Sequence, residues 1–166
     1  QLQRLREDEQ QLEALVQQLQ TQMPEQNLDP RLYSQLQAQL SWPIPGRLLA
    51  RFGSKRNFGQ LKWQGVLLSG KPGDKVRAVS RGRVAFADWL RGFGLLLIID
   101  HGDGYMSLYG NNTSLFKEVG DWVEGNDIIA SVGNSGNASE SGLYFEIRYQ
   151  GRPVNPMAWC KKLAAR

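Results

Sequence analysis

The chain has 166 residues, of which 41% are apolar and 22% are charged, and its formal net charge is +4. This length suits one domain of ordinary size with an extension, and the apolar content is sufficient for a buried core. No apolar run approaches the ~18 residues that a membrane-spanning helix needs. Because Cys160 is the single cysteine, an internal disulfide is excluded, and cysteine content does not define the compartment.

Charge divides the chain into two parts. Residues 1–40 carry three basic and six acidic residues, a net charge of −3, whereas residues 41–166 carry 17 basic and ten acidic residues, a net charge of +7. The basic residues are scattered among turns, and no nucleic-acid-binding motif is present, so we expect no nucleic acid partner. The chain begins at Gln1 without a methionine or a leader pattern, and we expect it to be part of a longer protein.

Residues 1–23 show a heptad pattern. Apolar residues recur at alternating spacings of three and four if Glu9 takes one polar position: Leu2, Leu5, Leu12, Val16, Leu19 and Met23. Such a seam predicts the end of a coiled coil. The alternative is a single amphipathic helix that packs on its own domain. Pro24 should end the helix, because proline removes a hydrogen bond and clashes with the preceding turn.

Residues 24–41 should form a linker and a short regulatory helix. Asp29 is a good N-cap, and Pro30 suits the first helical position, where its missing N–H costs nothing. An apolar stripe then runs along the predicted helix, formed by Leu32, Tyr33, Leu36 and Leu40. A helix this short is marginal alone in water, so we expect the stripe to be buried.

Residues 42–166 predict a mainly β domain. After the helix-breaking segment 42–46, short apolar runs alternate with glycine-containing turns, at 65–68, 75–79, 82–86, 95–99, 106–109, 127–132 and 143–149. Many short strands without helical periodicity between them are typical of an antiparallel sandwich or barrel. The turn at 103–104 predicts a hairpin between two of these runs.

Several motifs in order give the domain a family resemblance. They are GRV at 82–84, GFGLLLIIDHGDGYMSLY at 92–109, VGDWVEGNDIIASVGNSG at 119–136 and LYFEIR at 143–148. In this respect residues 42–160 resemble a LytM-type (lysostaphin-like) zinc endopeptidase domain. The resemblance implies a zinc ion held by a His-x-x-x-Asp pair and the last histidine of a His-x-His motif.

The positions that correspond to these ligands carry other residues. The His-x-x-x-Asp segment aligns with WQGVL, which places Trp63 and Leu67 at the ligand positions. Asn111 stands where the family has a catalytic histidine, and Gly142 and Tyr144 replace the His-x-His pair. A hydrolytic zinc needs three protein ligands with nitrogen or oxygen donors and one open position. We therefore expect no metal, no other cofactor and no catalytic activity.

His101 is the single histidine of the chain. As a ligand or a base it would need partners that the surrounding sequence does not supply. We interpret it as a turn residue that lies outside the catalytic set of the family.

The resemblance extends to catalytically degenerate members that act in bacterial cell division. It implies a periplasmic protein at the division septum of a Gram-negative bacterium. Such a protein activates N-acetylmuramoyl-L-alanine amidases, while its coiled coil engages an inner-membrane division complex. A passive peptidoglycan-binding module is the alternative that the sequence leaves open.

The vacated groove is the predicted binding surface for the amidase. It comprises the residues at and beside the lost ligand positions: Gln64, Leu67, Phe93, Asn111, Tyr144 and Arg148. Aromatic residues and arginine commonly anchor protein interfaces, although Leu67 and Tyr144 could also simply fill the space left by zinc. We further expect the helix at 30–40 to occupy the groove and inhibit the protein, because its apolar stripe is tethered close by. Packing of this stripe elsewhere is the alternative.

Overall fold

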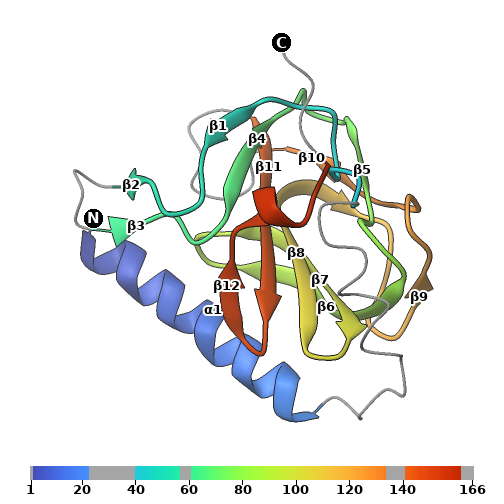
Figure 1. Cartoon of the computed structure of the whole chain (residues 1–166), viewed down its shortest axis with the longest axis horizontal. Helices are drawn as coiled ribbons and strands as arrows, with labels where there is room; N and C mark the ends of the chain where they lie inside the picture. The colour runs from blue at the N-terminus through green and yellow to red at the C-terminus, as the bar shows by residue number, and fades with distance from the viewer. Residues whose placement is uncertain (1, 23–39, 57–60, 134–140, 162–166) are drawn as a thin grey trace.

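The computed structural model describes residues 2–22, 40–56, 61–133 and 141–161. One long helix, α1 (Leu2–Gln22), lies along a mainly antiparallel β-sheet (Figure 1). A short 3-10 helix, η1 (Pro156–Ala158), follows the last strand. Among the helices described, none is both long enough and apolar enough to cross a lipid bilayer.

The described residues form twelve strands. They are β1 (Leu48–Ala50), β2 (Lys55–Arg56), β3 (Leu61–Lys62), β4 (Val66–Ser69), β5 (Lys75–Arg77), β6 (Gly82–Leu90), β7 (Gly94–Gly102), β8 (Tyr105–Leu115), β9 (Trp122–Val123), β10 (Ile128–Val132), β11 (Gly142–Tyr149) and β12 (Arg152–Val154). All seven predicted strands are present, and the mainly β antiparallel fold is confirmed. The short strands β1, β2, β3, β9 and β12 were not predicted, because two or three residues are too few for a periodic pattern.

The strands form one large sheet and one small ribbon. The main order is β1-β4-β11-β8-β7-β6-β9, with β10 paired to β8 and β5, and β12 paired to β11. Strands β2 and β3 pair only with each other. The predicted hairpin joins β7 to β8, and its turn residues Asp103 and Gly104 have φ angles of 53° and 82°. Positive φ angles at both central residues are typical of the tight turn that matches strand twist.

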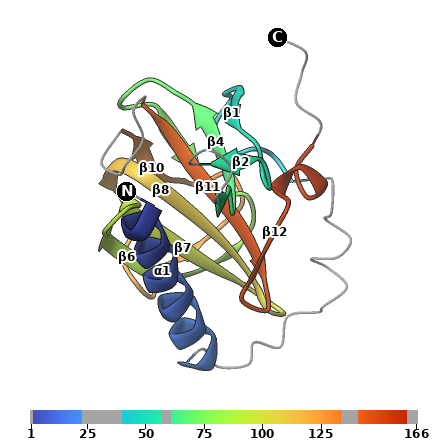
Figure 2. The same ribbon diagram turned by 90° about the vertical axis from the view of Figure 1, so that its left-hand side faces the viewer.

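The sheet buries apolar side chains on both faces. Along β7, Leu97 and Ile99 join the main core, whereas Leu96 and Ile98 join a second cluster on the opposite face. Successive residues of a strand point to opposite faces, so an uninterrupted apolar run requires cover on both sides. Figure 2 shows α1 in front of β7, β8 and β11, where it covers the second face.

The heptad seam of α1 is the surface that contacts the sheet. Leu12 is 1% exposed and Val16 is 0% exposed, and both belong to the second cluster. Leu15 and Leu19 pack beside them. This arrangement is the alternative considered above, a single helix packed on its own domain, because the apolar stripe of a coiled-coil seam also suits a sheet face.

The predicted regulatory helix at 30–40, with Leu32, Tyr33 and Leu36, lies outside the described residues except for its last position. Leu40 forms a parallel bridge with Cys160 and is buried in the main core beside Trp159. Its backbone N–H donates to the carbonyl of Trp159, 3.1 Å away, and its carbonyl accepts from Lys161 at 2.7 Å. The prediction for Leu40 is therefore wrong. Its apolar side chain extends the core, and its backbone pairs with the end of the domain.

Candidate partner-binding groove

The predicted groove residues come together on the face of the sheet that α1 covers. Strands β4 and β11 pair in a register that places Leu67 opposite Tyr144. One cavity, of about 300 Å³, is lined by Gln64, Phe93, Tyr144 and Arg148 together with residues of α1. A smaller cavity, of about 40 Å³, is lined by Trp63, Leu67, Phe93, Asn111 and Tyr144. The two cavities share Phe93, Tyr144 and Arg56, so the six predicted residues line two adjacent cavities, which together are called the groove below.

The side chains at the former ligand positions do not fit a zinc ion. Trp63 stacks against Tyr144 with a centroid distance of 6.2 Å and carries the Arg56 guanidinium 4.1 Å above its ring. The hydroxyl of Tyr144 donates to a carboxylate oxygen of Glu146 at 2.6 Å. Leu67 offers no donor atom. In the described part of the chain, no three His, Cys, Asp or Glu side chains gather as a metal site.

Two residues at positions where the family is expected to have histidine, Asn111 and Gly142, have backbone roles in this structure. Asn111 is 4% exposed, has a φ angle of 65°, and donates its backbone N–H to the carbonyl of Phe93 at 2.7 Å. Asparagine tolerates this left-handed conformation better than most residues. At Gly142, an added Cβ would lie 2.5 Å from the carbonyl oxygen of Leu68. Glycine is required there because the neighbouring strand approaches too closely for a side chain.

A line of polar side chains runs along the groove face of β11. Tyr144, Glu146 and Arg148 alternate with core residues, and Glu146 accepts from the Tyr144 hydroxyl and from the Arg148 guanidinium at 2.6 and 2.7 Å. Burial raises the pKa of Tyr144 well above its ordinary value, and the negative charge of Glu146 adds to the effect. Both groups are buried, so the phenol stays a neutral hydrogen-bond donor.

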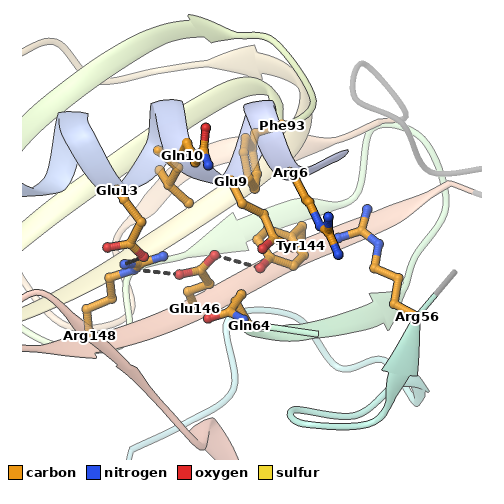
Figure 3. Close-up of a pocket in the computed structure, with 11 residues that line it drawn as sticks. Arg6, Glu9, Gln10, Glu13, Arg56, Gln64, Phe93, Tyr144, Glu146 and Arg148 are labelled. Atoms are coloured by element: carbon orange, nitrogen blue, oxygen red, sulfur yellow. Dashed lines mark hydrogen bonds and ion pairs between the residues drawn. The ribbon is translucent and has the colours of Figure 1, made fainter. Parts of the chain in front are cut away.

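Arg148 connects this line to the helix. Its guanidinium also donates to the carboxylate of Glu13 on α1 and to the backbone carbonyl of Gly151 (Figure 3). Burial would by itself lower the pKa of Arg148, but attraction to Glu146 and the hydrogen bonds with both carboxylates outweigh it and raise the pKa. Arg148 is 1% exposed, so it is a fixed cation between two carboxylates.

The N-terminal half of α1 is held by a second ion pair. Asp8 is 2% exposed, and one of its carboxylate oxygens lies 2.6 Å from Nε of Arg91 in the β6–β7 turn. Glu7 contacts the same guanidinium at 3.2 Å. Next to Arg91, Gly92 has a φ angle of 87°, and an added Cβ would lie 2.5 Å from Asp8. Only glycine allows both this turn conformation and the close approach of the helix.

Glu9 has a different environment from the other acidic residues of α1. It lines the larger cavity, and its Oε1 atom is buried without a hydrogen-bond partner among the residues described. Burial raises its pKa, and the positive charge of Arg56 only partly opposes this, while Glu146 and Glu13 add repulsion. Glu9 is therefore the one position of the heptad seam where docking of the helix carries an electrostatic cost.

His101 lies outside the groove. Its ring is buried at the end of β7, where Nδ1 lies 2.8 Å from the carbonyl oxygen of Arg81 and Nε2 lies 2.6 Å from Oγ of Ser107. The serine hydroxyl in turn bonds the Tyr109 hydroxyl at 2.7 Å. Burial lowers the pKa of His101 to about 4. This enclosed network orders the hairpin and has no surface at which a substrate could bind.

Sequence reasoning missed Arg56, Glu146 and the α1 residues of the groove. Glu146 could have been found, because it lies between Tyr144 and Arg148 in the strand alternation and must share their face. Arg56 comes from the separate β2–β3 ribbon, whose position over Trp63 has no sequence signal. The polar residues of α1, such as Glu13, could not be assigned to Arg148 because helical periodicity does not identify the surface against which a helix packs.

The fold is that of a metallopeptidase-like domain, and the positions predicted to correspond to the zinc ligands carry other residues. Residues 61–156 match a known family over more than half of the chain, and the chain belongs to Peptidase family M23. Two solved structures share the fold. They are a zinc-containing peptidase from Vibrio cholerae, with a TM-score of 0.68, 22% identity and coverage of 73% of this chain and 40% of that one, and the catalytic domain of lysostaphin from Staphylococcus simulans, with a TM-score of 0.63, 24% identity and coverage of 68% and 90%.

Curated relatives include proteins named as activators. The chain is 46% identical over 121 residues to the murein hydrolase activator EnvC of Escherichia coli K12, an alignment that covers 73% of this chain and 29% of that protein. It is 35% identical over 119 residues to the murein hydrolase activator NlpD of Salmonella typhimurium, covering 71% and 30% respectively. The chain thus spans less than a third of the length of these relatives.

Proposed function

We propose that this protein is a non-catalytic activator of murein hydrolases, and specifically of periplasmic N-acetylmuramoyl-L-alanine amidases at the division septum of a Gram-negative bacterium. The observation that carries the proposal is the replaced ligand set, because Trp63, Leu67 and Tyr144 convert a metal site into an apolar and aromatic groove. The names of the EnvC and NlpD relatives support the activator role. The N-terminal part of the full-length protein would engage an inner-membrane division complex.

The groove is the proposed amidase site. It combines aromatic rings, Phe93 and Tyr144, with the Arg56 and Arg148 guanidiniums. Aromatic and arginine side chains are the residues most often found at the energetic centres of interfaces, because they bury large surfaces and form forked hydrogen bonds. An amidase segment that binds here must present apolar side chains to the rings and at least one acceptor to Arg148.

The element that restrains the groove is α1. The helix at 30–40, predicted for this role, lies outside the described residues apart from Leu40, whereas α1 places Leu12 against the lining residues Phe93 and Tyr144. Burying Leu12 and Val16 contributes roughly 1.5–3 kcal/mol each. Since the helix and the groove belong to one chain, a partner must displace α1 before it can bind, and an upstream rearrangement that draws α1 away would expose the site.

The restraint is tested in the full chain by undocking the helix. Leu12→Asp with Val16→Asp places two carboxylates against apolar residues of the sheet and should release α1 without altering the groove residues that belong to the sheet. Labelled murein is incubated with a purified amidase and each variant, and we expect faster release of label with the undocked chain than with wild type. The matched control, Gln11→Asp with Gln18→Asp, adds the same charges to the exposed side of the same helix.

The outcomes separate the proposed function from its alternative. If neither chain changes the rate of murein hydrolysis by any amidase tested, yet both sediment with sacculi, the protein is a passive peptidoglycan-binding module. If wild type and the undocked chain stimulate the amidase equally, the activator role stands and the restraint by α1 is refuted.

A further inference from the structure

We infer that a second binding surface, formed by Trp122, Arg81 and Arg83, holds murein through its sugar rings and the carboxylates of its peptide stems. The surface lies where β9 pairs with β6, at the right-hand edge of Figure 1, whereas α1 runs along the lower left. None of the three residues lines either cavity of the groove. The choice of murein as the ligand rests on the proposed function, but the surface itself does not depend on it.

The three side chains form one compact cluster. Arg83 and Trp122 are direct partners in the β6–β9 pairing. The guanidinium carbons of Arg81 and Arg83 lie 5.5 and 5.9 Å from the centroid of the Trp122 ring. Both distances are within the range of cation–π attraction, which holds an arginine close to an aromatic ring. The two arginines therefore hold fixed positions beside the indole. Trp122 is 52% exposed, so part of its ring is open to a ligand.

The arginines of this cluster keep donors available to a ligand. Arg81 pairs with Glu124 at 3.5 Å, but both side chains are more than 60% exposed, so the pair is weak and readily exchanged. Nε of Arg83 donates to the carbonyl of Gly120 at 3.3 Å. Within the described ranges, no carboxylate forms an ion pair with Arg83. Its terminal nitrogens can thus donate to a carboxylate in the forked geometry that arginine favours.

Murein carries the two groups that this cluster would recognise. Its sugar rings present flat C–H faces that can pack on the exposed indole, and its peptide stems carry carboxylates that the two guanidiniums can bind. A phospholipid surface offers anionic groups, but it presents no sugar ring to the indole unless a glycolipid is present. The +7 net charge of residues 41–166 further favours an anionic polymer.

The position of the cluster has a functional consequence. Because β9 and α1 lie on different sides of the molecule, murein can be held whether the groove is covered or open (Figure 1). The protein would then stay bound to murein while α1 covers the groove, and it would recruit the hydrolase there after α1 is released.

The test is co-sedimentation of the full chain with purified sacculi. We expect Arg83→Ala with Trp122→Ala to weaken binding by about fivefold or more, as for loss of an interface anchor. The matched control is Trp89→Ala with Arg152→Ala, which removes one exposed tryptophan and one exposed arginine elsewhere. Arg83→Lys should retain part of the binding, because it keeps the charge and loses only the fork.

Three results would overturn the inference. The first is that wild type and the double variant sediment to the same extent, which includes the case in which neither sediments. The second is undiminished binding to sacculi whose carboxylates have been amidated. The third is binding to phosphatidylglycerol vesicles with the same dependence on Arg83 and Trp122, which would assign the surface to a membrane. Amidase stimulation in solution with soluble murein fragments should be the same for wild type and the double variant, so the proposed function is tested separately.

Discussion

Glu13 of α1 and Arg148 of β11, 135 positions apart in the chain, form an ion pair across the covered groove. Arg148 has a second carboxylate partner, Glu146, on its own strand. The cation is therefore neutralised within the sheet before the helix docks, and Glu13 adds a contact that can be exchanged for the carboxylate of another protein. The Arg148–Glu146 pair should therefore affect the stability of the domain, whereas the Arg148–Glu13 pair should affect how tightly α1 covers the groove.

Replacing Glu13 should loosen the helix while the domain stays folded. Glu13 is 45% exposed, and its loss leaves Arg148 paired with Glu146, so we expect Glu13→Gln to weaken docking by roughly 1 kcal/mol or less. Hydrogen exchange of the α1 backbone amides should become faster, with no change in β7 or β8. Gln11→Ala, on the exposed side of the helix, is the control. Unchanged exchange in α1 would show that the ion pair contributes nothing to docking.

Replacing Arg148 should instead unfold the domain more easily. Arg148 and Glu146 are 1% and 0% exposed, so their ion pair is buried within the folded domain. Arg148→Ala leaves a buried carboxylate without its cation, a change that typically costs about 3–5 kcal/mol. Urea denaturation measures it. The double variant Arg148→Met with Glu146→Gln should recover part of the loss, and failure to do so would mean that packing rather than charge sets the cost.

The contribution of Glu9 to docking of α1 should become more favourable in acid. Its pKa is raised in the docked state, chiefly by burial, so the docked form binds a proton more readily than the released form. The docking free energy is therefore most favourable below the ordinary pKa of Glu9 and weakens as pH rises through the raised pKa. The pKa of Glu7 is lowered by its hydrogen bonds to Gln3 and Arg91, which acts in the opposite direction, so the trend should appear in the difference between wild type and Glu9→Gln in exchange of the α1 amides, corrected for intrinsic rates. In Glu9→Gln, docking should be tighter at neutral pH and less dependent on pH.

The stability of the domain should fall between pH 6.5 and pH 4 because of His101. Burial lowers its pKa from 6.5 to about 4, so the unfolded chain binds a proton in this interval and the folded chain does not. Stability contributed by the neutral ring is full above pH 6.5 and is lost by about pH 4, a change on the order of 3 kcal/mol.

His101→Gln isolates this effect, because the chain has no other histidine. Burial raises the pKa of Asp100, which acts in the opposite direction, but Asp100 is present in both proteins. The wild-type minus variant difference in unfolding free energy should therefore follow the histidine. A difference that does not change with pH would show that the pKa of the ring is the same in the folded and the unfolded protein.

Zinc should have no effect on this protein. Trp63 and Leu67 provide no donor atoms, and the Tyr144 hydroxyl is bound to Glu146. Elemental analysis should detect no stoichiometric zinc, and a chelator should leave the unfolding midpoint unchanged, whereas a zinc-containing M23 peptidase treated in parallel should lose its metal. One tightly held zinc per chain would refute this assignment.

The sequence was informative wherever a pattern was long or a motif was specific. The runs at 95–99 and 143–149 predicted β7 and β11, and the family motifs located the residues that line the groove. The surface against which the apolar stripe of α1 packs could not be predicted, because Leu12 and Val16 at helical spacing suit a second helix and a sheet face equally well. The burial of Arg148 was also beyond sequence reasoning, because it arises from Glu146 and from the helix together, and strand alternation reports only the face on which a residue lies.

If α1 is released as proposed, the burial of β7 on both faces would make the released state short-lived. When α1 leaves, Leu96 and Ile98 lose the cover that the helix side chains provide, and water must contact a strip of sheet that is apolar along its length. An exposed apolar surface of this kind would soon be buried again, against the returning helix, the hydrolase or another copy of the chain. The time during which murein can be hydrolysed would then depend on whether a hydrolase is nearby when α1 is released. Overproduction of the protein alone would favour its aggregation over murein hydrolysis.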